Sequence, residues 1–259
     1  MQKISFQAVI LGSGTIVPSI VRSACSVLLK MDSTRLVLDT GPGTMRRLLQ
    51  VDTNIFDVSH ICYSHFHPDH VAELVPFLFG TKYPDAFFQK HPLTLFGGKG
   101  FIKFYNGLKA VYGDWMTPEK KWLQLVELSE NMHVGHQFDN FKLHVAVMNH
   151  RPESLAYRIQ LSDGRNVVYS GDTDYCENLI ELSKQTDLLI CECSTPEDMK
   201  ISGHLTPKLA GTIANKAQVK RLILTHLYPQ CDHVDLIAQA SQTYKGPIIV
   251  AEDLMTIWI

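Results

Sequence analysis

The sequence of 259 residues lacks any run of about eighteen uninterrupted apolar residues, roughly the least that a membrane-spanning helix requires. The short apolar stretch near its amino terminus is not followed by a signal-peptide cleavage pattern. Its six cysteines include no C-x-x-C pair, and a chain of this length does not need disulfides to fold. We therefore expect a cytoplasmic protein with reduced thiols and no membrane partner.

A strong charge of either sign is also lacking, since the formal net charge is −2 and the pI is about 6.6. No global field therefore attracts the protein to nucleic acid or to anionic lipid. Repeats, linkers and low-complexity segments are absent as well, because the 16 glycines and 12 prolines are scattered. Hydrophobic residues make up 45% of the chain, enough for the core of one large domain or of two small ones.

The spacing of apolar residues predicts mixed secondary structure, with strands prominent in the first two thirds of the chain. We predict helices at 45–51, 71–83, 100–113, 177–184, 206–217 and 234–241. We predict strands at 4–11, 24–30, 35–39, 60–64, 93–97, 122–128, 141–150, 154–161, 166–170, 188–192, 221–226, 248–251 and 255–259. Strand-rich halves with interspersed helices indicate two sheets packed as a sandwich and covered by helices.

Histidine is the unusual residue, because three of the twelve fall in one short segment together with an aspartate. His65, His67, Asp69 and His70 follow a predicted strand, where a tight loop can bring alternate side chains to one point. Imidazole and carboxylate are ligands of zinc and similar metals. A surface histidine cluster is the alternative, but this spacing seldom arises by chance. The segment therefore predicts a metal site, with His65 and His67 sharing one ion and Asp69 and His70 able to hold a second.

Further ligands for a two-metal site are expected at other strand ends. His150, Asp172 and His226 each follow a predicted strand, and a carboxylate at Asp172 can bridge two cations. A lone histidine in such a place is more often an ordinary loop residue. The presence of all three in a chain that also carries the histidine-rich segment favours the metal-binding interpretation.

With Asp39 in the segment LVLDTG, these residues match the motifs of the metallo-β-lactamase superfamily, which the sequence resembles. The resemblance implies an α/β fold, a four-layer αββα sandwich of two mixed sheets flanked by helices, and a binuclear metal site. It also implies that Asp39 organises the site without binding metal, the alternative being a turn-capping aspartate. Because the motifs extend from Asp39 to His226, we predict a single hydrolase domain over residues 1–259.

The sequence is further similar to ribonuclease Z, the tRNA 3′-end-processing endonuclease. The similarity lies in the segments GSGTIVPSIVR (12–22), HRPESLAYR (150–158) and GHLTPKLAGTIA (203–214), among others. Glu192 and His204 fall where that group carries a glutamate and a histidine beside the metals. The alternative is that neither residue has a catalytic role. Glu192 would then be a carboxylate at the end of a strand, and His204 would cap a helix.

One departure from ribonuclease Z concerns the substrate. Only twenty-one residues separate His150 from Asp172, whereas short-form ribonuclease Z enzymes insert a long basic arm in this interval to grip tRNA. A near-neutral chain without that arm loses much of the phosphate contact on which tRNA affinity depends. We therefore expect the catalytic resemblance to hold and tRNA to be disfavoured as substrate.

The resemblance implies a zinc-dependent phosphodiesterase that binds two Zn²⁺ ions, with Mn²⁺ or Fe²⁺ as possible substitutes. One ion would be held by His65, His67 and His150, the other by Asp69, His70 and His226, with Asp172 bridging them. A metal-bridging hydroxide would attack phosphorus while Asp69 orients its proton. His204, oriented by Glu192, would protonate the leaving group.

Several alternatives stay open at this point. We expect a small phosphodiester or nucleotide substrate, but true tRNA 3′-end cleavage, or hydrolysis of a carboxylic ester, thioester, lactone or sulfate ester, would use the same metals. An inactive metal-binding scaffold is disfavoured, since structural zinc sites do not need an open, bridged pair. Relatives are often homodimers, and we expect a homodimer. Among the other residues, Arg46 and Arg47 could face phosphate, but we expect them to be solvated. Phe87, Phe88 and Trp115 could line the mouth of a substrate site, but we expect them to pack in the core.

Overall fold

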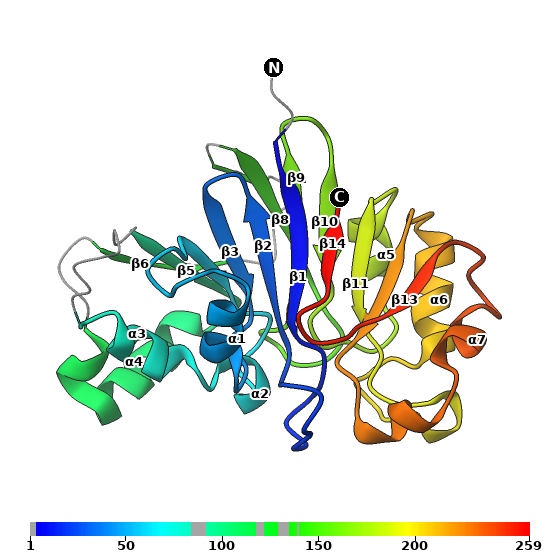
Figure 1. Ribbon diagram of the computed structural model, residues 1–259, viewed down its shortest axis with the longest axis horizontal. Helices are drawn as coiled ribbons and strands as arrows, with labels where there is room; N and C mark the ends of the chain where they lie inside the picture. The colour runs from blue at the N-terminus through cyan, green and yellow to red at the C-terminus, as the bar shows by residue number, and fades with distance from the viewer. Residues whose placement is uncertain (1–3, 84–91, 118–121, 129–134, 139) are drawn as a thin grey trace.

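The protein is an αββα sandwich, as predicted from the resemblance. The computed structural model describes residues 4–83, 92–117, 122–128, 135–138 and 140–259. Two sheets of seven strands each face one another, and helices cover the outer face of each sheet (Figure 1). Both sheets are mixed, which also agrees with the prediction.

The first sheet has the strand order β14-β1-β2-β3-β4-β5-β6. Its strands are β1 (Phe6–Gly12), β2 (Ser26–Met31), β3 (Thr34–Leu38), β4 (His60–Cys62), β5 (Leu93–Gly97), β6 (Leu123–Glu127) and β14 (Thr256–Trp258). Pairing is antiparallel from β14 to β3 and parallel from β3 to β6. The register pairs Leu38 with Cys62, so the residues that follow β3 and β4 leave the sheet at the same edge.

The second sheet has the order β13-β12-β11-β10-β9-β8-β7. Its strands are β7 (His136–Gln137), β8 (Phe141–Val147), β9 (Leu155–Leu161), β10 (Asn166–Tyr169), β11 (Leu188–Glu192), β12 (Leu222–Thr225) and β13 (Ile248–Val250). The strands from β10 to β13 are parallel, and β9 pairs antiparallel with both β8 and β10. Hence β8, β10, β11 and β12 all point in one direction, and their carboxyl ends share one edge.

The helices divide into two groups, one on each side of the sandwich (Figure 1). The first group is α1 (Thr44–Gln50), α2 (Pro68–Val71), α3 (Leu74–Gly80) and α4 (Phe101–Tyr112), and the second is α5 (Glu177–Ser183), α6 (Pro207–Lys216) and α7 (Leu236–Ala240). Three short 3₁₀ turns are η1 (Gly113–Met116), η2 (Glu197–Met199) and η3 (Pro229–His233). Among the described residues, no helix is long and apolar enough to cross a membrane.

The predicted helix at 71–83 is wrong in its boundaries, since the structure has two helices, α2 and α3, in its place. Pro76 accounts for the break. Proline has no N–H to donate to the carbonyl four residues earlier, so it is tolerated only in the first turn of a helix. A new helix, α3, accordingly begins at Leu74. The start of α2 at Pro68 places Asp69 and His70 on a rigid turn.

Three buried clusters hold the layers together. The largest lies between the two sheets and includes Phe141, Tyr157 and Tyr169. The other two lie between each sheet and its helices, as with Phe77 on the first side and Ile213 on the second. Because all three clusters are continuous along the strands, the edge that carries the strand ends is firmly supported.

Candidate metal centre

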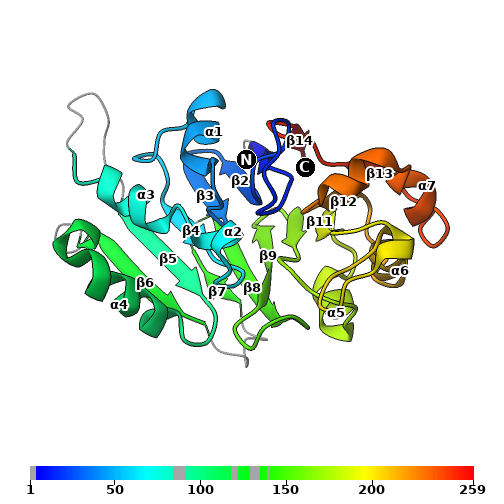
Figure 2. The same ribbon diagram turned by 90° about the horizontal axis from the view of Figure 1, so that it is seen from below.

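The loops at the carboxyl ends of both sheets meet at one edge of the sandwich. In the view onto this edge, α2 lies near the middle, with α3 and α4 on one side of it and α5 and α6 on the other (Figure 2). His150 follows β8, Asp172 follows β10, and His226 follows β12, while Glu192 is the last residue of β11. The common direction of these strands, which are distant in sequence, is what brings the side chains together.

The backbone at this edge is unusual in three places. Asp39 and His226 have left-handed φ angles of 60° and 58°, a conformation that non-glycine residues seldom adopt. Gly171, directly before Asp172, also has a positive φ of 55°, and a Cβ there would lie 2.5 Å from the Cβ of Ser64. Glycine is therefore required at this position, and the strand ends are held in conformations that aim the site residues.

The predicted ligands form groups in which the ligand atoms all lie within 4.8 Å of one another. These groups are His65, His67, His150 and Asp172; then Asp69, His70 and His226; and then Asp172, His204 and His226. All seven residues predicted to bind metal are thus brought together from distant parts of the chain. Asp172 and His226 each belong to two of these groups, so the groups adjoin one another.

The distances around Asp172 show how the groups join. Its Oδ2 lies 3.6 Å from His65 Nε2 and 3.9 Å from His150 Nε2. Its Oδ1 lies 3.3 Å from His70 Nε2 and 3.4 Å from His226 Nε2. Each carboxylate oxygen of Asp172 therefore faces a different set of histidines.

The buried atoms of the site fit divalent metal ions. His65 Nε2 and Asp172 Oδ1 are both buried, and neither has a hydrogen-bond partner among the described residues. Buried polar atoms are nearly always paired in folded proteins, so two such atoms at the centre of a ligand cluster indicate a missing partner. Imidazole nitrogens and carboxylate oxygens suit Zn²⁺ and similar metals.

The electrostatic environment keeps His65, His67 and Asp69 in the protonation state that binds metal, whereas burial of His70 is outweighed by Asp172 and Asp39, which raise its pKa. Burial, reinforced by the charge of His70, holds the pKa of His65 well below 6.5, and burial also lowers the pKa of His67. These rings are therefore neutral, as metal ligands must be. Burial alone would raise the pKa of Asp69, but the hydrogen bond and the charges of His226 and His70 lower it to about 2.

Asp39 lies behind the histidines and orients them. Its Oδ2 lies 2.7 Å from His70 Nδ1, and it accepts hydrogen bonds of 2.7 Å from the Ser64 and Tyr169 hydroxyls. The Ser64 hydroxyl also lies 3.0 Å from His65 Nδ1. A partner on Nδ1 fixes the ring and leaves Nε2 to face the metal. This arrangement agrees with the organising role predicted for Asp39.

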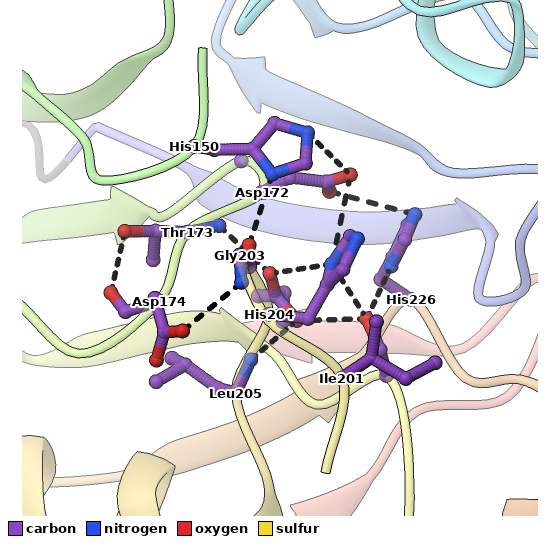
Figure 3. Close-up of polar contacts among 12 residues, drawn as sticks. His150, Asp172, Thr173, Asp174, Ile201, Gly203, His204, Leu205 and His226 are labelled. Carbon is purple, nitrogen blue, oxygen red and sulfur yellow. Dashed lines mark hydrogen bonds and ion pairs between the residues drawn. The ribbon is translucent and has the colours of Figure 1, made fainter.

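On the second sheet, too, a polar group lies against the Nδ1 atom of the histidines, here His150 and His226 (Figure 3). The Ser194 hydroxyl lies 3.0 Å from His226 Nδ1 and donates to Glu192 Oε2 at 2.8 Å. The Gly203 carbonyl lies 2.9 Å from His150 Nδ1. Ser64, Tyr169 and Ser194 are not predicted from the sequence. The only signal for the serines is that each lies within two residues of a predicted site residue.

His204 lies beside the cluster, with its Nδ1 3.0 Å from Glu192 Oε1 and 4.0 Å from Asp172 Oδ2 (Figure 3). Burial alone would lower its pKa. The hydrogen bond to Glu192 and the charge of that carboxylate outweigh burial and raise the pKa of His204 to about 9. His204 therefore carries a proton at neutral pH and can donate one.

Comparison with known proteins agrees with the fold. Residues 34–227, more than half of the chain, match the beta-lactamase superfamily domain, and the chain therefore belongs to this superfamily. It is 27% identical to ribonuclease Z of Methanosarcina acetivorans in an alignment of 300 positions, gaps included, that covers 96% of each protein. It is 30% identical to an uncharacterized protein of Mycobacterium leprae in an alignment of 237 positions, gaps included, that covers 84% of this chain and 75% of that protein.

Solved structures show the same fold. The metallo-beta-lactamase fold protein YhfI from Bacillus subtilis superimposes with a TM-score of 0.85 at 22% identity, covering 99% of this chain and 100% of that one. The short form of human tRNase Z superimposes with a TM-score of 0.78, also at 22% identity, covering 97% and 98%. At these identities the structural likeness concerns the fold.

Expectations for residues outside the ligand cluster had mixed outcomes. Trp115 is 60% exposed, so its predicted place in the core is wrong: it lies in η1, at the exposed end of α4. Arg46 is exposed as predicted, but the Arg47 guanidinium lies 2.9 Å from Asp253, which comes from the far end of the chain. Phe87 and Phe88 lie outside the described residues.

Proposed function

We propose that this protein is a binuclear-metal-dependent phosphodiesterase. The observation that carries the proposal is the arrangement around Asp172, whose two oxygens face different histidine sets. A carboxylate in this position can bind one cation through each oxygen. A structural zinc site would instead be closed by four ligands around a single ion.

The ligands divide between the two proposed ions as the sequence predicts. His65, His67 and His150 would hold one ion, Asp69, His70 and His226 the other, and Asp172 both. The mixed nitrogen and oxygen donors favour Zn²⁺, with Mn²⁺ or Fe²⁺ as substitutes. When bound, the ions would lower the pKa of a water molecule and offset the charge that develops on the phosphoryl oxygens.

Residues of the chain would handle the protons. The Asp69 carboxylate, ionised because its pKa is about 2, would orient the attacking water. His204, protonated because Glu192 raises its pKa to about 9, would donate a proton to the leaving oxygen. Glu192 also accepts hydrogen bonds from Ser194 and from the Thr173 amide, and these hold it in place.

A phosphodiester substrate is supported by the relatives. They include ribonuclease Z proteins, and the structural neighbours include a diphosphatase and the yeast protein PDE1. A tRNA substrate is disfavoured by the interval from His150 to Asp172. All of this interval is described, and it contains β9, β10 and short connections, with no arm. The net charge of −2 gives no compensating attraction to RNA.

The test is a substrate panel with the metal-loaded protein. We expect hydrolysis of bis-p-nitrophenyl phosphate and little cleavage of a 3′-extended tRNA precursor. Turnover of a thioester or lactone without any diester hydrolysis would contradict the proposal, and efficient tRNA cleavage would replace it with tRNA processing. Metal analysis should find two ions per chain. The homodimer, the single domain and the cytoplasmic location stay predictions. Light scattering would test the homodimer.

A further inference from the structure

A cavity of about 670 Å³ opens beside the metal centre. Its walls come from the loop that carries the metal ligands, from α2 and α3, and from α4 with η1. Cavities of this size hold small organic ligands. None of the roles proposed above for the ligand cluster uses this space.

The cavity and the metal centre share a wall. Phe66 and Pro68 line the cavity, and they alternate along the chain with the proposed ligands His65, His67 and Asp69. The short helix α2 continues this division, because Val71 and Ala72 line the cavity while Asp69 and His70 belong to the ligand cluster. A molecule in the cavity therefore lies directly across one loop from the metal ligands.

The cavity is lined almost entirely by apolar side chains. Phe66 and Phe104 stack in parallel, with ring centroids 4.7 Å apart and an interplanar angle of 6°. Phe79 meets Trp115 edge-on at 5.3 Å, and Leu108 lines the wall between these pairs. No charged side chain lines the cavity among the described residues. Hydrogen-bonding side-chain atoms come only from Tyr112 and Trp115.

The cavity is also open to solvent on the side of α4 and η1. Tyr112 is 46% exposed and Trp115 is 60% exposed, although both are large aromatic residues. A concave apolar surface of this kind is uncommon on a protein unless it binds something. A nucleobase is a poor occupant, because most of its polar edge atoms would lose water without gaining partners.

We propose that this cavity binds the hydrocarbon part, alkyl or aryl, of an amphiphilic phosphodiester whose phosphate lies at the metal centre. The proposal rests on the proposed function and narrows its substrate class. The shared wall formed by Phe66 and Pro68 is the basis for assigning one molecule to both places. Burial of each methylene group in the cavity would then strengthen binding.

An inhibitor series tests the proposal. The protein hydrolyses methyl p-nitrophenyl phosphate while straight-chain alkyl phosphates, from methyl to hexyl, are added as competitors. We expect the inhibition constant to fall up to about fourfold for each methylene that is buried, and at least about tenfold over the series. An inhibition constant that does not change with chain length overturns the proposal.

Two variants of α4 distinguish an effect of filling the cavity from a general effect of adding a tryptophan to this helix. Leu108→Trp fills the cavity, so we expect it to abolish the dependence of the inhibition constant on chain length, while inhibition by methyl phosphate, which is too short to reach the cavity, is unchanged. Ile102→Trp is the matched control, because Ile102 is also on α4, is 43% exposed and does not line the cavity. If both variants keep the dependence, the hydrocarbon binds elsewhere and the proposal is wrong.

A second copy of the chain is the other possible occupant, and the same variants identify it. The cavity would be a subunit interface if the protein is a dimer that Leu108→Trp dissociates and if the inhibition constant does not change with chain length. That result would overturn the proposal.

Failure of the proposed function is recognised separately, by the absence of any diester hydrolysis. In that case binding of hexyl phosphate is followed through Trp115 fluorescence, with methyl phosphate and the Trp115→Phe variant as controls. A saturable change with hexyl phosphate alone supports the cavity assignment, and no change overturns it.

Discussion

Asp39 and His70 form a fully buried polar pair in the site: Asp39 Oδ2 lies 2.7 Å from His70 Nδ1, and neither side chain is exposed to solvent. The pair has a direct consequence for metal binding. Nδ1 is occupied by a carboxylate, so Nε2 is the atom left to face His226 and Asp172, at 3.4 and 3.3 Å. Asp39 thus acts on the metal through His70.

We predict that Asp39→Asn lowers metal affinity about 10- to 100-fold, the usual effect of removing a carboxylate behind a ligating histidine. The amide keeps the shape of the side chain but cannot hold the ring with the same charge. Competition with a chelator measures the affinity. Asp198→Asn, a change at an exposed residue, is the control and should have no effect. An unchanged affinity in Asp39→Asn would show that Asp39 only caps a turn.

We predict that Asp172→Ala loses metal-dependent hydrolysis and binds fewer than two ions per chain. The reason is geometric, since both ligand sets lose one oxygen in this variant. Elemental analysis and diester turnover measure the two effects. Circular dichroism should show that the variant is folded, because Asp172 belongs to none of the three apolar clusters. Full activity with two bound ions would disprove the bridging role.

The sequence predicts well which residues come together, because His65, His150, Asp172 and His226 each follow an apolar strand that is recognisable on its own. His150, Asp172 and His226 become informative once the strands are known to share an edge. The supporting hydroxyls cannot be found in this way. Asp39 and Tyr169, for example, are 130 residues apart, and their hydrogen bond depends on the packing of one sheet against the other.

Prediction of the helices from the sequence has a similar limit. Local spacing predicts a single helix at 71–83, because Pro76 alone does not show whether a helix kinks, ends or starts again. Trp115 was expected in the core because large aromatic residues usually pack there. Trp115 belongs instead to a stretch, from residue 109 to 115, that is exposed throughout, and this depends on the packing of the whole first layer.

We predict that His204→Gln slows hydrolysis according to the leaving group. A general acid contributes roughly 10²- to 10⁴-fold when the leaving oxygen needs a proton. An alkyl leaving group should therefore lose at least about 100-fold in kcat, while p-nitrophenolate, which leaves without protonation, should lose far less. Glu192→Gln should show the same preference, because Glu192 holds His204.

The metal content distinguishes this role from a ligand role for His204, which lies near Asp172 and His226. We expect two ions per chain in His204→Gln, as in the wild type. Equal rate losses for both leaving groups, or the loss of an ion, would contradict the role of proton donor.

His60 gives a prediction about stability, away from the metal centre. It begins β4 and lies among Phe96, Phe138 and Phe141, with ring centroids 5.2 to 6.2 Å away. Burial in this aromatic setting lowers its pKa from 6.5 to about 4. Between pH 6.5 and 4 the unfolded chain therefore binds a proton that the folded chain does not bind. The stability associated with neutral His60 is present above pH 6.5 and is lost as the pH falls through this range.

His60→Phe removes this titration and keeps an aromatic ring in the same setting. We predict that lowering the pH from 7.5 to 4.5 reduces the free energy of unfolding of the wild type by roughly 2 kcal/mol more than that of the variant. Denaturant titrations at the two pH values measure the difference. His233→Phe, at an exposed position, is the matched control and should behave like the wild type. If the wild type and His60→Phe lose the same free energy of unfolding, His60 accepts its proton while the protein stays folded. The aromatic setting then does not exclude the charge.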